Sequence, residues 1–197
     1  METHIDLYKE ATNRLNAFLN QLSWQLPKEE AKKSVLIKEP KDIAGFIEHT
    51  NLKAFATSDD IKKLCAEAIR YSFKAVCIPL CHVSYAVKLL KDSDVIVCTV
   101  IGFPLGNNPT DIKVLEAKIA KKAGAKEIDM VLPIHALKDQ DYQSVYEDIN
   151  KVVLTLGGQA KLKVILETAY LTDLEIVLAC MIAEKAGADF VKTSTGF

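Results

Sequence analysis

The sequence predicts an α/β fold of the (β/α)8 class, the TIM barrel, with six βα units visible and an N-terminal helical extension. One observation is a repeated frame of helix end, small-residue turn and strand: Lys185–Lys192 superposes on Lys122–Asp129, and Arg70–Cys77 keeps the same offset. A second observation is that, from Ile43 onward, short β-branched or apolar runs alternate with longer helical runs. This alternation is typical of parallel strands joined by crossover helices.

Residues 1–40 form the N-terminal extension and differ in pattern from the rest of the chain. Pro27 and Pro40 bracket a connector rich in lysine and glutamate. We expect the extension to cover one end of the barrel or to meet a partner subunit, and residues 41–197 to form the partial barrel. Apolar residues at three- and four-residue intervals predict an amphipathic helix in the extension: Leu7, Ala11, Leu15, Phe18 and Leu22.

The barrel region predicts six strands separated by helices, without a linker that would divide it. A helix over 58–71 has cap-like oxygens on Ser58 and Asp59, and a helix over 109–123 has them on Thr110 and Asp111. The predicted strands lie near 46–49, 75–78, 95–100, 127–132, 162–167 and 190–193.

Six strands do not close a barrel that needs eight, so we expect an unpaired sheet edge and an exposed apolar interior. The chain therefore looks truncated at its C-terminal end. The alternative is that the N-terminal extension or a second subunit fills the missing space.

Composition limits the classes of function. The chain of 197 residues is 49% hydrophobic, enough for one well-buried domain, and its net charge of −1 with a pI near 6.4 gives no basic face for nucleic acid or a membrane surface. No apolar run approaches the thickness of a bilayer, and the first residues lack a signal-peptide pattern, so we expect a cytoplasmic protein. The five scattered cysteines are expected to be reduced thiols.

Equal offsets in the repeated frame predict equal depth in the barrel. Alternate strands of such a barrel contribute side chains to one interior layer, so Cys77, Asp129 and Lys192 should point at each other. The alternative is a core with incidental polar residues, but an unpaired buried acid or amine costs several kcal/mol.

Other polar residues lie near the carboxyl ends of the predicted strands, where barrel enzymes keep their sites. Lys163 and Glu167 face the same way on one strand, either as a buried ion pair or as part of the site. Thr193 lies at the end of the last predicted strand. Cys77 with Cys81 and His82 resembles a zinc motif, but strand alternation aims Cys77 away from the other two, so we expect no metal.

A lysine inside a mostly apolar barrel is suited to Schiff-base chemistry. Desolvation, or a nearby cation, favours the neutral amine that attacks a carbonyl. The iminium that forms draws electrons from the neighbouring carbon, and a carboxylate such as Asp129 can move the protons. Formation or cleavage of a carbon–carbon bond follows from this chemistry.

The chain from about Ile43 to its end resembles deoxyribose-phosphate aldolase, a class I aldolase family with a (β/α)8 barrel. The segments that carry the resemblance are Glu48-His49-Thr50-x-Leu52, Ala75-Val76-Cys77-Ile78, Phe103-Pro104-x-Gly106, Glu127-Ile128-Asp129-Met130-Val131, Leu162-Lys163-Val164-Ile165-Leu166-Glu167-Thr168 and Phe190-Val191-Lys192-Thr193-Ser194-Thr195-Gly196.

The resemblance implies Lys192 as the Schiff-base lysine, Asp129 as the proton-relay acid and Cys77 as an active-site cysteine, with Glu48 also in the pocket. It implies a lyase that reversibly cleaves 2-deoxy-D-ribose 5-phosphate to acetaldehyde and D-glyceraldehyde 3-phosphate. Neither a metal nor an organic cofactor is implied. The expected partners are a sugar phosphate and an aldehyde, and a homodimer is an assembly we allow for.

Two departures from the family pattern keep other functions open. Glu48 stands where the family usually has aspartate, and the second active-site lysine and the phosphate-binding loops of strands seven and eight have no counterpart here. Without that lysine, Lys192 is expected to keep its proton unless Lys163 compensates. The alternatives are a non-catalytic barrel fragment or paralogue that binds a ligand or partner, and a transaldolase-like Schiff-base lyase.

Overall fold

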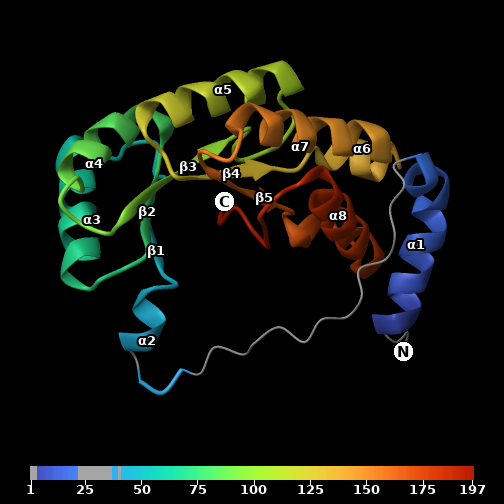
Figure 1. Cartoon of the computed structure of the whole chain (residues 1–197), viewed down its shortest axis with the longest axis horizontal. Coiled ribbons are helices and arrows are strands. Elements are labelled where there is room, and N and C mark those ends of the chain that lie inside the picture. Colours follow the sequence, from blue (N-terminus) through green and yellow to red (C-terminus); the bar gives the residue numbers. More distant parts are fainter. Residues whose placement is uncertain (1–3, 22–36, 40) are drawn as a thin grey trace.

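The computed structural model describes residues 4–21, 37–39 and 41–197. Its six parallel strands form one sheet in the order β1-β2-β3-β4-β5-β6, so strands adjacent in sequence pair with one another. The sheet curls with helices on its outer face, as Figure 1 shows, which confirms the predicted α/β class and its six βα units. The strands are β1 (Glu48–Thr50), β2 (Ala75–Ile78), β3 (Ile96–Ile101), β4 (Glu127–Val131), β5 (Lys161–Ile165) and β6 (Phe190–Lys192).

The helices make the outer layer and connect successive strands. Residues at the helix ends explain the repeated frame of the sequence, since α5 and α8 both stop at a left-handed glycine, Gly124 and Gly187, before the chain enters β4 and β6. The helices are α1 (His4–Gln21), α2 (Lys41–Ala44), α3 (Ser58–Arg70), α4 (Val83–Leu89), α5 (Thr110–Ala123), α6 (Ile134–Lys138), α7 (Tyr142–Leu156) and α8 (Asp173–Ala186), with short 3-10 turns at Leu80–His82 and Thr168–Tyr170.

Strand alternation separates two buried faces of the sheet. Val76, Ile78 and Ile128 belong to the large apolar core between sheet and helices. Ala75, Cys77 and Cys98 form a separate small cluster. That second cluster marks the inner face of the curled sheet, on which Cys77 was expected.

The predicted helix caps are wrong in detail. Helix α3 is capped by Thr57, whose hydroxyl accepts from the Asp60 amide at 3.2 Å while the Asp60 carboxylate accepts from the Thr57 amide at 2.8 Å. Ser58 and Asp59 already lie inside the helix. At α5 the cap position is Pro109, and Thr110 instead donates to Asp148 of α7 at 2.7 Å.

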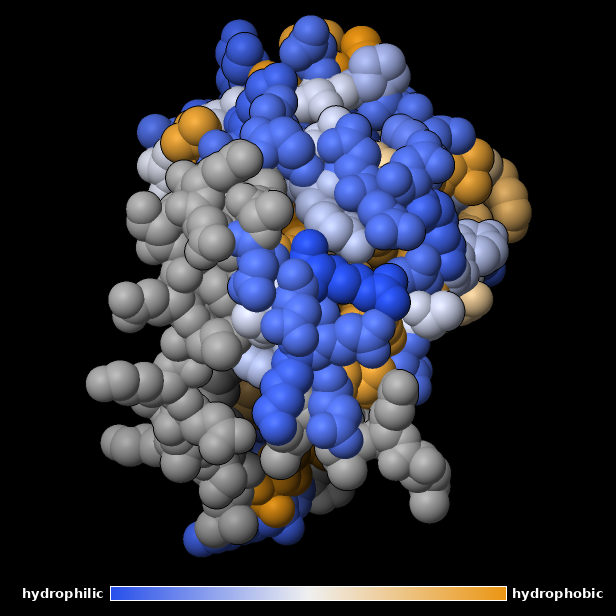
Figure 2. Space-filling model, turned by 90° about the vertical axis from the view of Figure 1, so that its right-hand side faces the viewer, coloured by the Kyte–Doolittle hydropathy of each residue, from blue (hydrophilic) through white to orange (hydrophobic). Residues whose placement is uncertain are grey.

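Helix α1 packs on the helical layer, mainly against α8 and α7. Ala11 and Leu15 of the predicted stripe are fully buried there. The described helix lies on the outer helical layer, not at an end of the barrel or in the space between β1 and β6, and the alternative that a partner subunit is involved stays a prediction. Figure 2 shows this side of the molecule, on which the residues coloured by hydropathy are mostly hydrophilic. Leu22, the Phe18 side chain and most of the connector from Pro27 to Pro40 lie outside the described residues.

The first and last strands each pair on one side alone in the described chain. Apolar side chains are exposed at or near these edges: Phe46 is 58% exposed, Phe190 48% and Val191 47%. The expectation of unpaired edges with exposed apolar residues is therefore confirmed. None of the helices in the described part of the chain combines the length and apolar character that a membrane crossing requires.

Candidate active site

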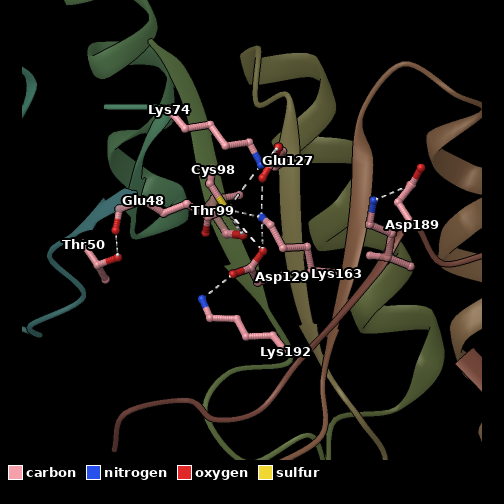
Figure 3. A network of polar contacts seen from close by, with 11 residues as sticks. Glu48, Thr50, Lys74, Cys98, Thr99, Glu127, Asp129, Lys163, Asp189 and Lys192 are labelled. Carbon is pink, nitrogen blue, oxygen red and sulfur yellow. Dashed lines mark hydrogen bonds and ion pairs between the residues drawn. The ribbon is translucent and has the colours of Figure 1, made fainter. Parts of the chain in front are cut away.

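Charged side chains gather on the inner face of the sheet, as Figure 3 shows. Lys192, at the end of β6, places Nζ 2.7 Å from Oδ2 of Asp129 on β4. The Asp129 side chain is fully buried and that of Lys192 is 32% exposed. The predicted convergence of these two residues is confirmed, whereas their catalytic roles remain predictions.

Both carboxylate oxygens of Asp129 have donors. Its Oδ1 accepts from Nζ of Lys163 on β5 at 2.8 Å and from the Cys98 thiol on β3 at 3.3 Å, while Oδ2 accepts from Lys192. A buried carboxylate without such partners would cost several kcal/mol. The two ammonium groups therefore satisfy both oxygens of the buried side chain and hold it in one orientation.

Lys163 is surrounded by acids. Besides Asp129, its Nζ lies 2.5 Å from Oε2 of Glu127 and 3.0 Å from Oε1 of Glu48. The alternative in which Lys163 pairs with Glu167 is wrong, because Lys163 is directed to these three carboxylates.

The acids extend the contacts toward the start of β2. Lys74, just before that strand, lies 2.7 Å from the second oxygen of Glu127. Lys74, Glu127, Lys163, Asp129 and Lys192 thus form a continuous row of alternating charge, which we call the charge ladder.

The ladder decides the protonation of the lysines. Burial lowers the pKa of Lys192, but the Asp129 carboxylate and the thiols of Cys77 and Cys98 outweigh it, so the pKa is raised above the usual value of lysine. Burial also acts to lower the pKa of Lys163, and its acidic partners again outweigh it and raise the pKa. Lys163 therefore does not supply the compensation that would favour a neutral Lys192 in this arrangement.

The pKa values of Glu48 and Glu127 are shifted in opposite directions, although both carboxyls contact Lys163. Burial raises the pKa of Glu48, ahead of the opposing effect of Lys163. Burial also acts on Glu127, but its ion pairs with Lys163 and Lys74 outweigh it and lower the pKa of this carboxyl. Glu127 is thus the more firmly ionised member of the pair.

Cys77 lies beside this group, on β2, and is fully buried. Its sulfur, the Cys98 sulfur and a carboxylate oxygen of Asp129 lie within 4.8 Å of one another. Two ammonium groups already occupy the Asp129 oxygens, which argues against a cation there. Cys81, of the sequence motif that resembled a zinc site, is exposed and stands apart from this triad.

Glu167 and Thr193 lie where β5 and β6 end. Glu167 has a left-handed backbone, with φ 53°, and its carboxylate accepts from the amide of Thr195 at 3.0 Å and from the Thr195 hydroxyl. The Thr193 carbonyl accepts from the Thr168 amide at 2.9 Å, and its hydroxyl accepts from Ser194 at 3.2 Å. Both residues shape the segment that follows Lys192, and among the described residues their side-chain hydrogen bonds go to Ser194 and Thr195 rather than to the charge ladder.

A cavity of about 510 Å³ lies between the end of β1, helix α3 and the last residues of the chain. His49 at its wall is 2.8 Å from the Glu67 carboxylate, which is consistent with a structural role for this histidine. The lining residues include His49, Thr50, Asn51, Lys53, Thr195 and Gly196.

Comparison with known proteins identifies the family. Residues 46–197 match the profile of a family described as DeoC/LacD family aldolase. The chain belongs to the DeoC/LacD family of aldolases. Two curated relatives are similar in sequence. They are the deoxyribose-phosphate aldolases of Thermococcus gammatolerans, 56% identical over 159 residues, and of Aciduliprofundum boonei, 53% identical over 160 residues. These alignments cover 79% and 81% of this chain, and 71% and 72% of the two relatives.

Solved structures support the same DeoC/LacD assignment. A putative deoxyribose-phosphate aldolase from Coccidioides immitis matches with a TM-score of 0.81 at 41% identity, over 96% of this chain and 73% of the other. A tetrameric deoxyribose phosphate aldolase from Aeropyrum pernix matches with a TM-score of 0.74 at 30% identity, over 99% of this chain and 73% of the other.

Three residues of this candidate site were not predicted from the sequence: Glu127, Cys98 and Lys74. A signal existed for Glu127, because it lies two residues before Asp129 on one strand and so shares its face. Cys98 pairs in register with Cys77, which a correct alignment of β2 and β3 would have given. Lys74 precedes its strand and carried no signal of its own.

Proposed function

We propose that this chain catalyses the reversible cleavage of 2-deoxy-D-ribose 5-phosphate to acetaldehyde and D-glyceraldehyde 3-phosphate, through a Schiff base on Lys192. The observation that carries the proposal is the contact of 2.7 Å between Lys192 Nζ and Asp129 Oδ2 inside a barrel-type sheet. The names of the relatives support the choice of substrate. Carbon–carbon lyase chemistry follows from family membership.

The first half of the reaction forms the covalent intermediate. The neutral amine of Lys192 attacks the aldehyde carbon of the open-chain sugar, and loss of water from the adduct gives an iminium ion. Asp129 is the nearest base to Nζ and takes the proton that the ammonium must lose. The Lys192 side chain is 32% exposed, which is consistent with the approach of an aldehyde to it.

The second half breaks the carbon–carbon bond. A base removes the proton of the hydroxyl on the third sugar carbon, that oxygen becomes the aldehyde of glyceraldehyde 3-phosphate, and the electrons of the broken bond pass into the iminium to give an enamine. Protonation of the enamine carbon and hydrolysis then release acetaldehyde and restore the amine. Asp129, held by Lys163 on its other oxygen, is the carboxylate placed to return the proton.

A second candidate is a non-catalytic barrel that binds a ligand or a partner. The raised pKa of Lys192 favours it, because a firmly protonated amine does not attack a carbonyl.

Borohydride reduction in the presence of acetaldehyde, followed by peptide mass analysis, separates the two candidates. Aldolase chemistry gives a two-carbon adduct on Lys192 that is absent from Lys192→Met and retained in Lys161→Met, whose lysine is largely exposed. A folded sample without adduct on any lysine supports the non-catalytic barrel, and an adduct from a larger sugar donor alone supports a transaldolase-like lyase.

The finer features of the setting belong to the same proposal. We place the reaction in the cytosol, since all five cysteines are free thiols, as is usual in reducing compartments.

We also propose a homodimer, and sedimentation at several protein concentrations tests it against a monomer and against the tetramer described for the Aeropyrum pernix protein.

A further inference from the structure

The charge ladder reaches from one rim of the sheet to the other. Successive links measure 2.7 Å from Lys74 to Glu127, 2.5 Å on to Lys163, 2.8 Å to Asp129 and 2.7 Å to Lys192. The end side chains are 30% and 32% exposed, whereas the three inner ones are 4%, 7% and 0% exposed. Figure 3 shows the row running along the inner face of the strands.

The proposed mechanism uses only the Lys192 end of this row. Glu127 is almost fully buried and carries a carboxylate whose two oxygens contact Lys74 and Lys163, so it acts on Lys192 through its partners alone. In a buried row each charge is felt by its neighbours more strongly than in water, because the effective dielectric constant is lower.

We propose that Glu127 is a positioning residue that sets the proton affinity of Lys192 through Lys163 and Asp129, and that Lys74 acts in the opposite sense. The proposal rests on the proposed function in taking Lys192 as the nucleophile. Without Glu127, the ammonium of Lys163 would interact more strongly with the Asp129 carboxylate. The same carboxylate would then stabilise the ammonium form of Lys192 less.

The sign follows from the charges. Replacing Glu127 by glutamine removes a negative charge from the row, so the Lys192 ammonium is less stabilised and loses its proton at lower pH. Replacing Lys74 by methionine removes a positive charge, so the same proton is lost at higher pH. Titratable groups that act on Lys192 are Asp129 on β4, Cys77 on β2 and Cys98 on β3. Glu48 on β1 contacts Lys163 at 3.0 Å and Lys74 at 3.7 Å, and both variants leave these four groups in place.

Competitive labelling of Lys192 with acetic anhydride over a pH series, read by peptide mass analysis, measures this proton affinity. We expect the labelling midpoint to fall by roughly 0.5 to 1 pH unit in Glu127→Gln and to rise by about half a unit in Lys74→Met. Glu147→Gln, which removes the carboxylate of an exposed pair on α7, is the matched control and should leave the midpoint unchanged.

The opposite directions distinguish positioning from a structural role. Loosening of the fold would move both variants the same way, and shifts of one sign, or no shift in either, overturn the proposal. Thermal melting by circular dichroism verifies that each variant is folded, and Lys74→Met, at a partly exposed position, still tests the proposal where Glu127→Gln does not fold. The labelling needs no turnover, so its outcome is separate from that of the borohydride experiment on the proposed function.

Discussion

Asp129 is fully buried, and Lys192, Lys163 and the Cys98 thiol all donate to its carboxylate oxygens. This arrangement gives the carboxylate two tasks that oppose each other. It is the base nearest to the nucleophile, and it is also the charge that keeps that nucleophile protonated.

Asp129→Asn separates these two tasks. The amide cannot take a proton, so we expect the rate of adduct formation at Lys192 to fall by about a hundredfold or more. Asp129 raises the pKa of Lys192 in the native chain. With an uncharged amide in place of the carboxylate this pKa should fall, so the acetylation of Lys192 should begin at lower pH. Asp139→Asn, at an exposed position, is the control, and an unchanged adduct rate in Asp129→Asn would remove Asp129 from the mechanism.

At this scale the sequence predicted which residues share a face but not which atoms pair. Cys77, Asp129 and Lys192 were found because equal offsets in a repeated frame fix depth in the barrel. The partners of Lys163 were missed, since three acids from two strands reach it across distances that depend on the curl of the sheet.

The elements around the site are joined by a second buried ion pair. Lys113 of α5 is fully buried, and its Nζ lies 2.6 Å from Oδ2 of Asp148 on α7 and 3.1 Å from the carbonyl oxygen of Val131 on β4. Burial lowers the pKa of Lys113, ahead of the opposing effect of Asp148. The pair ties two helices to the strand that carries Asp129.

Asp148→Asn leaves the Lys113 ammonium without its counter-charge in an apolar interior. We expect a loss of about 3 kcal/mol in the free energy of unfolding, measured by urea denaturation. Removing both charges, with Lys113→Met and Asp148→Leu, should restore most of it, because no uncompensated charge remains. Equal losses in the single and the double variant would contradict this account.

The capping box of α3 offers a test at a single helix end. Thr57→Ala removes a side chain that accepts from the Asp60 amide, and we expect it to cost about 1 kcal/mol in the free energy of unfolding. Ser58→Ala, one residue inside the helix, is the matched control and should change the stability by no more than a few tenths of a kcal/mol. A larger effect at Ser58 would return the cap to the residue that the sequence indicated.

The strands were predicted to within about two residues because hydrophobic runs and left-handed helix ends are local signals. The caps were not, since Thr57 and Ser58 both carry a hydroxyl that can cap a helix, and the extended backbone that makes Thr57 the cap is not displayed by the sequence. Similarly, Thr110 was expected to cap its own helix and instead bonds to Asp148, a partner 38 positions away in the chain.

At the scale of the molecule, the sheet of the described residues ends in two edge strands with exposed apolar side chains at or near them. Such surfaces favour association between chains. Phe46→Lys, which places a charge beside β1, should lower the concentration-dependent association seen by sedimentation. Leu154→Lys changes a residue that is 70% exposed on the outer surface of α7 and should leave association unchanged. Equal association in the two variants would mean that the β1 edge takes no part.

The order of strands followed from the sequence, because consecutive βα units place neighbouring strands side by side. The position of the N-terminal helix did not. An apolar stripe shows that a helix is covered on one face, but the identity of the covering surface depends on a connector whose path is not a local property.

Helix α1 packs against α8, so two segments from opposite ends of the sequence lie side by side. Leu15 is fully buried in this packing, and α8 leads directly into the strand that ends at Lys192. An affinity tag or a deletion ahead of Leu15 lies more than 170 positions from that lysine. A change there that disturbs the packing of α1 would therefore alter the support of α8 and of the strand that carries Lys192. Tags for expression are therefore best placed where they do not disturb the contact between α1 and α8.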